Sequence, residues 1–216
     1  MINKNTEYFF PVALTLGAAV AVLGSIRFLD REIASAVMKL LHSRHILDTA
    51  TAKIPDALLF LVCFGTAIMW LAYIYLSRNK APVAQLRFLQ LAATAVPSAY
   101  LLKAFLKFIF GRTNTRSWLL SGEPLQFNWF HGAGTGSFPS GHMTVFTAFG
   151  ATIWYYCPRY RRHTLLALVL LGTALIATDY HFLSDVIAGS YVGLIVTTVV
   201  RYGLDNWVNM AKSSAD

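Results

Sequence analysis

The chain has 216 residues, of which 56% are hydrophobic and only 13% are charged. A soluble domain carries about 25% charged residues, so this composition excludes an ordinary soluble protein and indicates a membrane protein. The net charge is +8, but the basic residues are scattered, which indicates charged membrane loops rather than nucleic-acid binding. The two cysteines, Cys63 and Cys157, lie in or at the end of apolar runs and offer neither a disulfide framework nor a zinc-binding spacing.

Apolar runs predict how often the chain crosses the membrane, because about 20 helical residues span a bilayer. The expected spans cover about residues 9–26, 57–76, 86–110, 143–156, 165–180 and 184–202. No clear A-x-A site follows the first run, so we interpret it as a retained span rather than a cleaved signal peptide. The predicted fold class is therefore all-α, a polytopic membrane protein with six transmembrane helices in one domain, 1–216.

A polar segment, residues 27–55, separates the first two spans. Asp30 can cap a short helix whose apolar residues recur at helical spacing: Ile33, Val37, Leu40 and Leu41. This pattern predicts an amphipathic helix at the membrane surface, and a plain connector is the alternative.

The longest loop, residues 111–138, is rich in glycine and carries Trp118 and Trp129. A connection of this length in a compact protein is usually functional or disordered. Tryptophan is favoured where a membrane meets water, so we expect an ordered loop at the bilayer surface.

Loop charges predict the orientation. The side with both termini and the short basic loops 77–87 and 158–163 has nine Lys and Arg residues, and the other side also has nine. Four of the latter, Lys103, Lys107, Arg112 and Arg116, cluster around the long loop and have a chemical explanation. Without these four, the side with the termini has nine Lys and Arg residues and the other side has five. Since cytoplasmic loops are richer in Lys and Arg, this difference predicts cytoplasmic termini and an outward-facing long loop.

Three predicted helix junctions then meet at one depth on the outer side. They bring together basic, hydroxyl, imidazole and carboxylate groups: Lys107, Arg112, Arg116, Ser140, His142, His181 and Asp185. A helix start such as Pro139-Ser140-Gly141-His142 is a ready phosphate site, because its backbone N–H groups have no partner within the helix. A carboxylate four residues after His181 can fix the imidazole tautomer and free the other nitrogen as a nucleophile.

Simpler interpretations of these residues remain open. Lys103, one helical turn before Lys107, can extend its ammonium to the membrane interface. Asp185 can act with Ser184 as a helix N-cap. A zinc site built from four residues is also conceivable, although no close ligand pair anchors it: His131, His142, His181 and Asp185.

At these positions the chain resembles the membrane-integral type 2 phosphatidic acid phosphatases, whose motifs are shared with vanadium haloperoxidases and bacterial acid phosphatases. The second motif of that family is present intact as Pro139-Ser140-Gly141-His142. The second half of the third motif is present as His181-Phe182-Leu183-Ser184-Asp185. The first motif is represented by Lys107 and by the approach Gly111-Arg112-Thr113. The resemblance covers about residues 86–202, with the motifs within 103–189.

Two arginines of the family pattern are replaced in this chain. Asn114 and Thr115 stand where the first motif has Arg-Pro, and Leu175 stands where the third motif has Arg. Arg112 and Arg116 flank Asn114, and either could reach the phosphate instead. Asn114 itself can still donate through its amide.

The resemblance implies a metal-independent, cofactor-free lipid phosphatase of the inner (plasma) membrane, with its site facing outward. Lys107, Arg112 or Arg116, Asn114, Ser140 and Gly141 would bind the phosphate. His181, oriented by Asp185, would form a phosphohistidine, and His142 would be the acid and then the base. The substrate would be phosphatidic acid, phosphatidylglycerol phosphate, undecaprenyl pyrophosphate or a lipid A phosphate.

A transferase of the same chemistry and a non-catalytic lipid-phosphate binder are the alternative functions. The expected partners are the lipid substrate and the bilayer, without nucleic acid. The sequence does not predict an oligomeric state.

Overall fold

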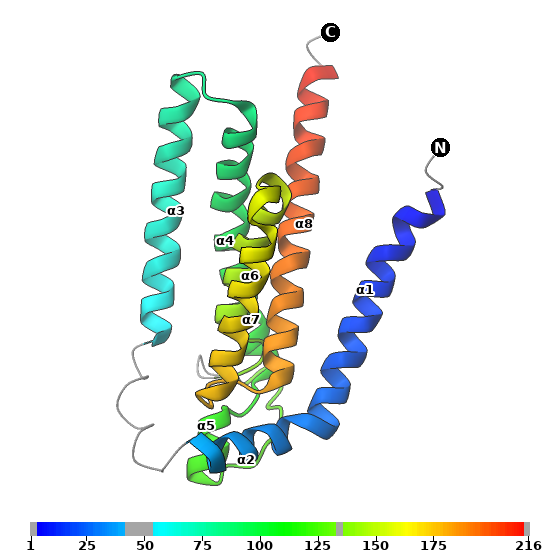
Figure 1. Cartoon of the computed structure of the whole chain (residues 1–216), viewed down its shortest axis with the longest axis vertical. Helices are drawn as coiled ribbons and strands as arrows, with labels where there is room; N and C mark the ends of the chain where they lie inside the picture. Colours follow the sequence, from blue (N-terminus) through cyan, green and yellow to red (C-terminus); the bar gives the residue numbers. More distant parts are fainter. Residues whose placement is uncertain (1–3, 42–53, 133–135, 214–216) are drawn as a thin grey trace.

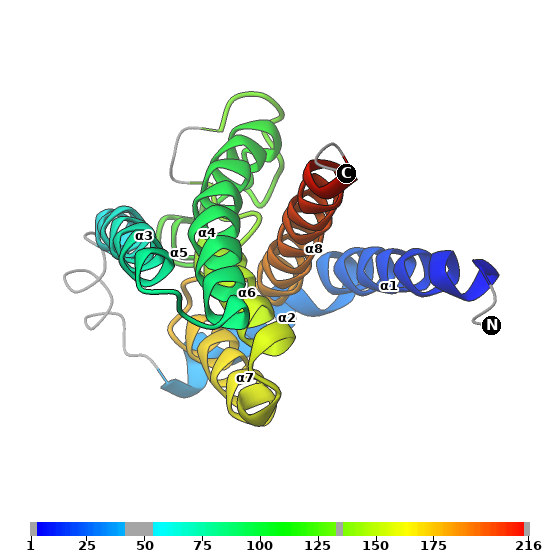
Figure 2. The ribbon, with the colours of Figure 1, turned by 90° about the horizontal axis from the view of Figure 1, so that it is seen from above.

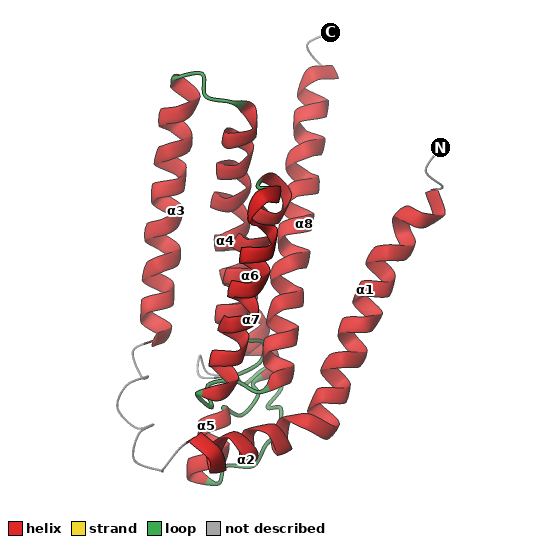
Figure 3. Cartoon of the chain, viewed as in Figure 1, coloured by secondary structure: helices red, strands yellow, loops and turns green. Residues whose placement is uncertain are grey.

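The computed structural model describes residues 4–41, 54–132 and 136–213, and most of these are helical. The elements are α1 (Lys4–Gly24), a π-helical turn (Ser25–Leu29), α2 (Asp30–Leu41), α3 (Ile54–Arg78), α4 (Val83–Phe110), α5 (Thr115–Ser121), α6 (Gly141–Tyr156), a 3-10 turn (Pro158–Tyr160), α7 (Arg161–Ala177) and α8 (Leu183–Ser213). Figure 3 shows helices joined by loops and, within the described ranges, no strand. The predicted all-α class is confirmed.

The long helices form a bundle (Figure 1), with the long loop around α5 at its lower end and the short connection between α3 and α4 at its upper end. α6 is central, because it packs against α4, α7 and α8, while α3 packs on α4 and α1 on α8. Figure 2, seen from above, shows α1 and α3 on opposite sides of this centre. The ends of α4 and α7 and the starts of α6 and α8 meet at the lower end of Figure 1, where α2 and α5 lie across the bundle.

Five helical stretches of the described residues are long and apolar enough to cross a membrane: Val12–Leu40, Ala57–Arg78, Val83–Phe110, Pro158–Ala177 and Leu183–Trp207. The chain is therefore a polytopic membrane protein. α6 is the remaining expected span, and its 16 residues measure about 24 Å at about 1.5 Å per residue. That length is less than the hydrocarbon core of about 30 Å, so the count of six spans stays a prediction.

The boundaries differ from the expected ones in two places that shape the site. α7 ends at Ala177, three residues earlier than expected, which leaves a turn before His181. The long loop contains a helix that the sequence pattern did not indicate, α5, which is only seven residues long.

The amphipathic helix is present as α2, but Asp30 does not cap it. The chain is already helical before Asp30, and the buried Asp30 carboxylate binds Arg112 and Ser184 instead. Leu41 of the expected apolar face has a side chain outside the described ones. That α2 lies at the membrane surface stays a prediction.

Small residues allow the central helices to approach closely. Ala99 and Ala148 are fully buried and pack with Val196 where α4, α6 and α8 meet. On α8, a Cβ at Gly189 would overlap the backbone oxygen of Ser140, and a Cβ at Gly193 would overlap that of Thr144. The two glycines thus hold the start of α6 directly against α8.

Candidate active site

The Pro-Ser-Gly-His segment begins α6 as predicted. Ser140 is the N-cap, and its hydroxyl accepts a hydrogen bond from the N–H of Met143 at 3.4 Å. The backbone N–H of Ser140 donates to the carbonyl of Asp185 at 3.0 Å. This bond fixes the start of α6 against the first turn of α8, so the second and third motifs adjoin.

His181 lies in the short turn between α7 and α8. Its Nδ1 is 3.4 Å from Oδ2 of Asp185, and that same oxygen accepts the backbone N–H of Phe182 at 3.1 Å. His181 and Asp185 are 3% and 0% exposed, so their interaction is shielded from water. The expected pairing is present although α8 begins only at Leu183, after the histidine.

Burial lowers the pKa of His181 below its ordinary value, and the positive charges of Lys107 and Arg112 lower it further. Asp185 acts in the opposite direction, and the net shift is downward. The imidazole is therefore neutral at neutral pH. With Nδ1 facing Asp185, Nε2 is the nitrogen available for reaction.

Leu175 does not occupy a phosphate-binding position. Its side chain is buried with Met143 and Val186 in an apolar cluster. Its carbonyl accepts the N–H groups of Tyr180 and His181, at 3.0 and 3.2 Å. The residue at the family's arginine position thus shapes the turn that presents His181.

Arg112 is placed by the end of α4. Gly111 ends the helix in a left-handed conformation (φ 50°), and a Cβ there would overlap the carbonyl of Asn128. The chain turns there and directs Arg112 inward, where it is 1% exposed and its guanidinium lies 4.4 Å from the Phe182 ring centroid.

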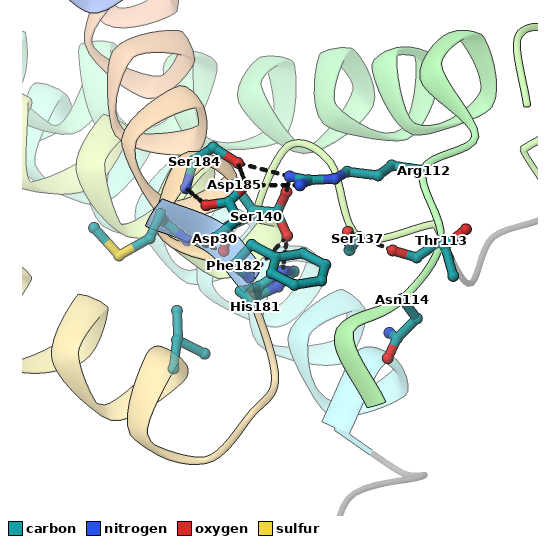
Figure 4. Close-up of polar contacts among 12 residues, drawn as sticks. Asp30, Arg112, Thr113, Asn114, Ser137, Ser140, His181, Phe182, Ser184 and Asp185 are labelled. Atoms are coloured by element: carbon teal, nitrogen blue, oxygen red, sulfur yellow. Dashed lines mark hydrogen bonds and ion pairs between the residues drawn. The ribbon is translucent and has the colours of Figure 1, made fainter. Parts of the chain in front are cut away.

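Two carboxylates bind this guanidinium, as Figure 4 shows. One terminal nitrogen is 2.6 Å from Oδ1 of Asp185 and also donates to Oγ of Ser184 at 2.6 Å. The other is 2.6 Å from Oδ2 of Asp30. Arg112 therefore lies behind Asp185 as part of its support, rather than as an open phosphate ligand.

Asn114 is the N-cap of α5, and its side-chain oxygen accepts the N–H of Arg116 at 2.9 Å. Figure 4 shows it well apart from the Asp185 group. Arg116 crosses to the turn after α7, donating to the Thr178 carbonyl at 2.8 Å with its guanidinium 5.3 Å from the Tyr180 ring centroid. Of the two arginines considered, Arg116 is the one that contacts Tyr180, whereas Arg112 binds the carboxylate that faces His181.

His142 is half-buried in the first turn of α6, with its ring centroid 5.6 Å from that of Tyr180. The Tyr180 ring also meets that of His181, at 5.0 Å between centroids. Tyr180 thus lies against both imidazoles. Neither pattern nor spacing in the sequence singled it out.

The two lysines of α4, Lys103 and Lys107, are half-buried, and they lie near the candidate site. Lys107 lies close enough to Asp185 and Lys103 to interact with them electrostatically. Lys103 reaches the start of α6, because a Cβ at Gly141 would lie 3.5 Å from its Nζ. The sequence left open whether Lys103 extends to the interface, and in this structure it packs against the glycine of the second motif.

Asp30 and Ser184 belong to the site although sequence reasoning gave them only capping roles. Their signal was weak: one of two neighbouring acidic residues in a polar connector, and a serine before a motif aspartate. The four residues of the alternative zinc site are not gathered as ligands. The described residues contain no group of three His, Cys, Asp or Glu side chains able to hold a metal ion.

A sequence model of one family, described as the PAP2 superfamily, matches residues 87–208, more than half of the chain. The chain belongs to the PAP2 superfamily. The match includes His142, His181, Asp185 and the two lysines of α4. It leaves α1 and α2 outside. This membership confirms the family resemblance of the three motifs.

Among solved structures, the chain is similar to a transmembrane PAP2-type phosphatidylglycerolphosphate phosphatase from Bacillus subtilis. The two share 18% sequence identity, with a TM-score of 0.46, over 92% of this chain and 96% of the other. No curated protein sequence matches the chain significantly.

Proposed function

We propose that this PAP2 protein is a lipid phosphatase that hydrolyses a lipid phosphomonoester or pyrophosphate on the outer face of the plasma membrane. The observation that carries the proposal is the buried His181–Asp185 pair beside the intact Pro-Ser-Gly-His helix start. The pair provides a neutral, oriented imidazole, and the helix start provides backbone donors for a phosphate.

In the proposed reaction, Nε2 of His181 attacks phosphorus and the bond to the lipid oxygen breaks. His142, in its protonated form, gives a proton to that oxygen, which leaves as an alcohol or a lipid monophosphate. His142 then takes a proton from water, whose oxygen attacks the phosphohistidine and releases inorganic phosphate. Asp185 stabilises the positive charge that His181 acquires in the first step.

Cationic side chains hold the phosphate oxygens in this proposal, so no metal ion is needed. Lys107 and Arg116 approach from α4 and α5, and Lys103 reaches the Gly141 N–H region from α4. Such charge stabilisation and positioning supply most of the rate in phosphoryl transfer. Asn114 and Arg112 have structural partners in this chain and are not assigned to the substrate.

The lipid tail has a suitable place in this proposal. An apolar groove of about 500 Å³ runs between α1, α7 and α8, with Ala18, Gly172 and Tyr191 among its lining residues. Met143 and Leu183 also line it, and each adjoins the site along the chain. A substrate with its tail in this groove would present its phosphate near His142.

Phosphate release by the detergent-purified protein tests the proposal. The four candidate substrates are phosphatidic acid, phosphatidylglycerol phosphate, undecaprenyl pyrophosphate and lipid A. Each is assayed without an added acceptor, both with and without EDTA. We expect release from at least one lipid, unaffected by EDTA and lost in His181→Ala. Release only with an added lipid or sugar acceptor would indicate a transferase, and no release under either condition would contradict catalysis.

A further inference from the structure

Asp30 lies outside the residues that match the family, yet it is part of the catalytic network. It is 1% exposed and comes from the first turn of α2. Its Oδ1 accepts the backbone N–H of Ser184 at 3.0 Å, and its Oδ2 accepts the Ser184 hydroxyl at 2.5 Å. Oδ2 also binds the Arg112 guanidinium at 2.6 Å. This one carboxylate therefore joins α2 to the start of α8 and to the loop after α4.

The network continues from Arg112 to the nucleophile. Arg112 binds Oδ1 of Asp185, and the other oxygen of Asp185 faces Nδ1 of His181. Asp30, Arg112, Asp185 and His181 thus form a buried chain in which no member is more than 3% exposed (Figure 4). Burial on this scale makes each charge strongly felt by the next.

The charge balance of this chain gives Asp30 a specific task. Arg112 and Asp185 alone would form a neutral pair, in which the guanidinium draws the carboxylate away from His181. Asp30 supplies a second negative charge, so that one guanidinium is shared between two carboxylates. Asp185 then remains negatively charged on the side that faces the imidazole. This charge stabilises His181 when it becomes positive in the proposed reaction.

We infer that Asp30 is a positioning residue for the nucleophile, acting through Arg112 on Asp185. This inference rests on the proposed function for its effect on rate. The N-terminal unit of α1 and α2 is then a working part of the site rather than only a membrane anchor.

The closing experiment compares Asp30→Asn with Glu32→Gln in the full-length protein. Both changes remove one carboxylate charge from the first turn of α2, but Glu32 is exposed and lies outside the network. We expect Asp30→Asn to lower kcat about 10- to 100-fold with KM nearly unchanged, as for other partners of catalytic side chains. Glu32→Gln should leave both constants unchanged.

An NMR titration of histidine-labelled protein measures the pKa of His181 without a substrate. The His181 signal is assigned as the one that is missing in His181→Ala. The charged and titratable groups that face His181 are Lys107 from α4, Arg112, His142 from α6, Tyr180 and Asp185 from α8. Removing the negative charge of Asp30 destabilises the imidazolium, so the pKa of His181 should fall by about half a unit or more. A local packing defect would not produce this direction, because greater water access raises the pKa of a buried histidine.

A conservative variant covers the case in which Asp30→Asn does not fold. Asp30→Glu keeps the negative charge that binds Arg112, so its kcat and the pKa of His181 should stay close to the wild-type values. An unchanged His181 titration in Asp30→Asn, or a clear fall of the His181 pKa in a folded Asp30→Glu variant, would overturn the inference. A wild-type protein that releases no phosphate from any lipid would refute the proposed function, while the titration would still decide the role of Asp30.

Discussion

Two arginines take different roles at this site. Arg112 has both terminal nitrogens bound to buried carboxylates, Asp30 and Asp185. Arg116 is partly exposed and crosses to the turn that carries Tyr180. In the proposed reaction, Arg112 therefore maintains the network behind His181, and Arg116, which lies against Tyr180, is a candidate phosphate ligand.

Alanine substitution at each arginine separates these roles. Arg112→Ala would leave two buried carboxylates without their cation, so it should lower the free energy of unfolding by about 3–5 kcal/mol and abolish turnover. Arg116→Ala should change the melting temperature little and raise the KM for lipid about tenfold. Thermal melts and steady-state kinetics in detergent measure both. The account of Arg112 fails if its alanine variant is as stable as the wild type and loses only substrate affinity.

In the proposed reaction, the acid limb of the kcat/KM profile follows from the pKa of His181. Only the neutral imidazole would attack phosphorus, so activity should fall on the acid side as His181 becomes protonated. The folded-state pKa lies below the usual value of about 6.5, which moves this acid limb to lower pH. We expect substantial activity to persist below pH 6.5. Asp185→Asn removes the negative charge that raises the pKa of His181. The acid limb of its kcat/KM profile should therefore lie at still lower pH, and the maximal kcat/KM should be much smaller. An acid limb at higher pH than in the wild type would be inconsistent with the pairing.

The pairing of His181 with Asp185 could be predicted from the sequence, because both residues lie within one short motif and a spacing of four residues limits their separation. Asp30 was not accessible, since its partners Arg112 and Ser184 are far away along the chain and meet it only in the folded bundle. The structural role of Asn114 was hidden for a related reason: it depends on α5, a helix too short to produce a clear pattern.

At the scale of helices, the close contact between α6 and α8 positions the site. Gly189 lies one turn after Asp185 and allows Ser140 to bond to the Asp185 carbonyl. The apolar runs predicted these helices well, because membrane burial dictates composition. They gave no information on which faces meet, since in a membrane every face of a helix can be apolar.

Gly189→Ala tests this contact, with Gly203→Ala in the same helix as its control. The added methyl at 189 would overlap the Ser140 backbone, so we expect a lower melting temperature and a kcat reduced at least tenfold. A Cβ at Gly203 meets nothing within 4 Å, so that variant should be neutral or more stable by about 0.5–1 kcal/mol. Equal behaviour of the two variants in melts and assays would argue against a site built on this contact.

At the scale of the whole molecule, all site residues lie at one end of the bundle, and α1 begins and α8 ends at the other end (Figure 1). Loop charges predict that the site end faces outward. α2 and α5 cover this end, and Asp30 of α2 binds Arg112, which in turn binds Asp185. The sequence predicted the gathering of the helix ends, because alternating spans must return to the same side.

Cysteine labelling in intact cells tests the orientation. In a background of Cys63→Ala and Cys157→Ala, we expect Glu123→Cys to react with a membrane-impermeant maleimide. Ser77→Cys, in the exposed last turn of α3 at the opposite end, should react only after the membrane is opened. The reverse pattern would place the site in the cytoplasm and contradict the predicted topology.

The central claim is that His181, held by Asp185, is the nucleophile of a lipid phosphatase. Rapid quenching with a lipid substrate, followed by mass spectrometry under alkaline conditions, detects the intermediate directly. We predict a phosphoryl group on His181 in the wild-type protein, stable to base and labile to acid, and none in His181→Ala. Phosphate release without any modified histidine, or a phosphorylated His142 in its place, would contradict the account.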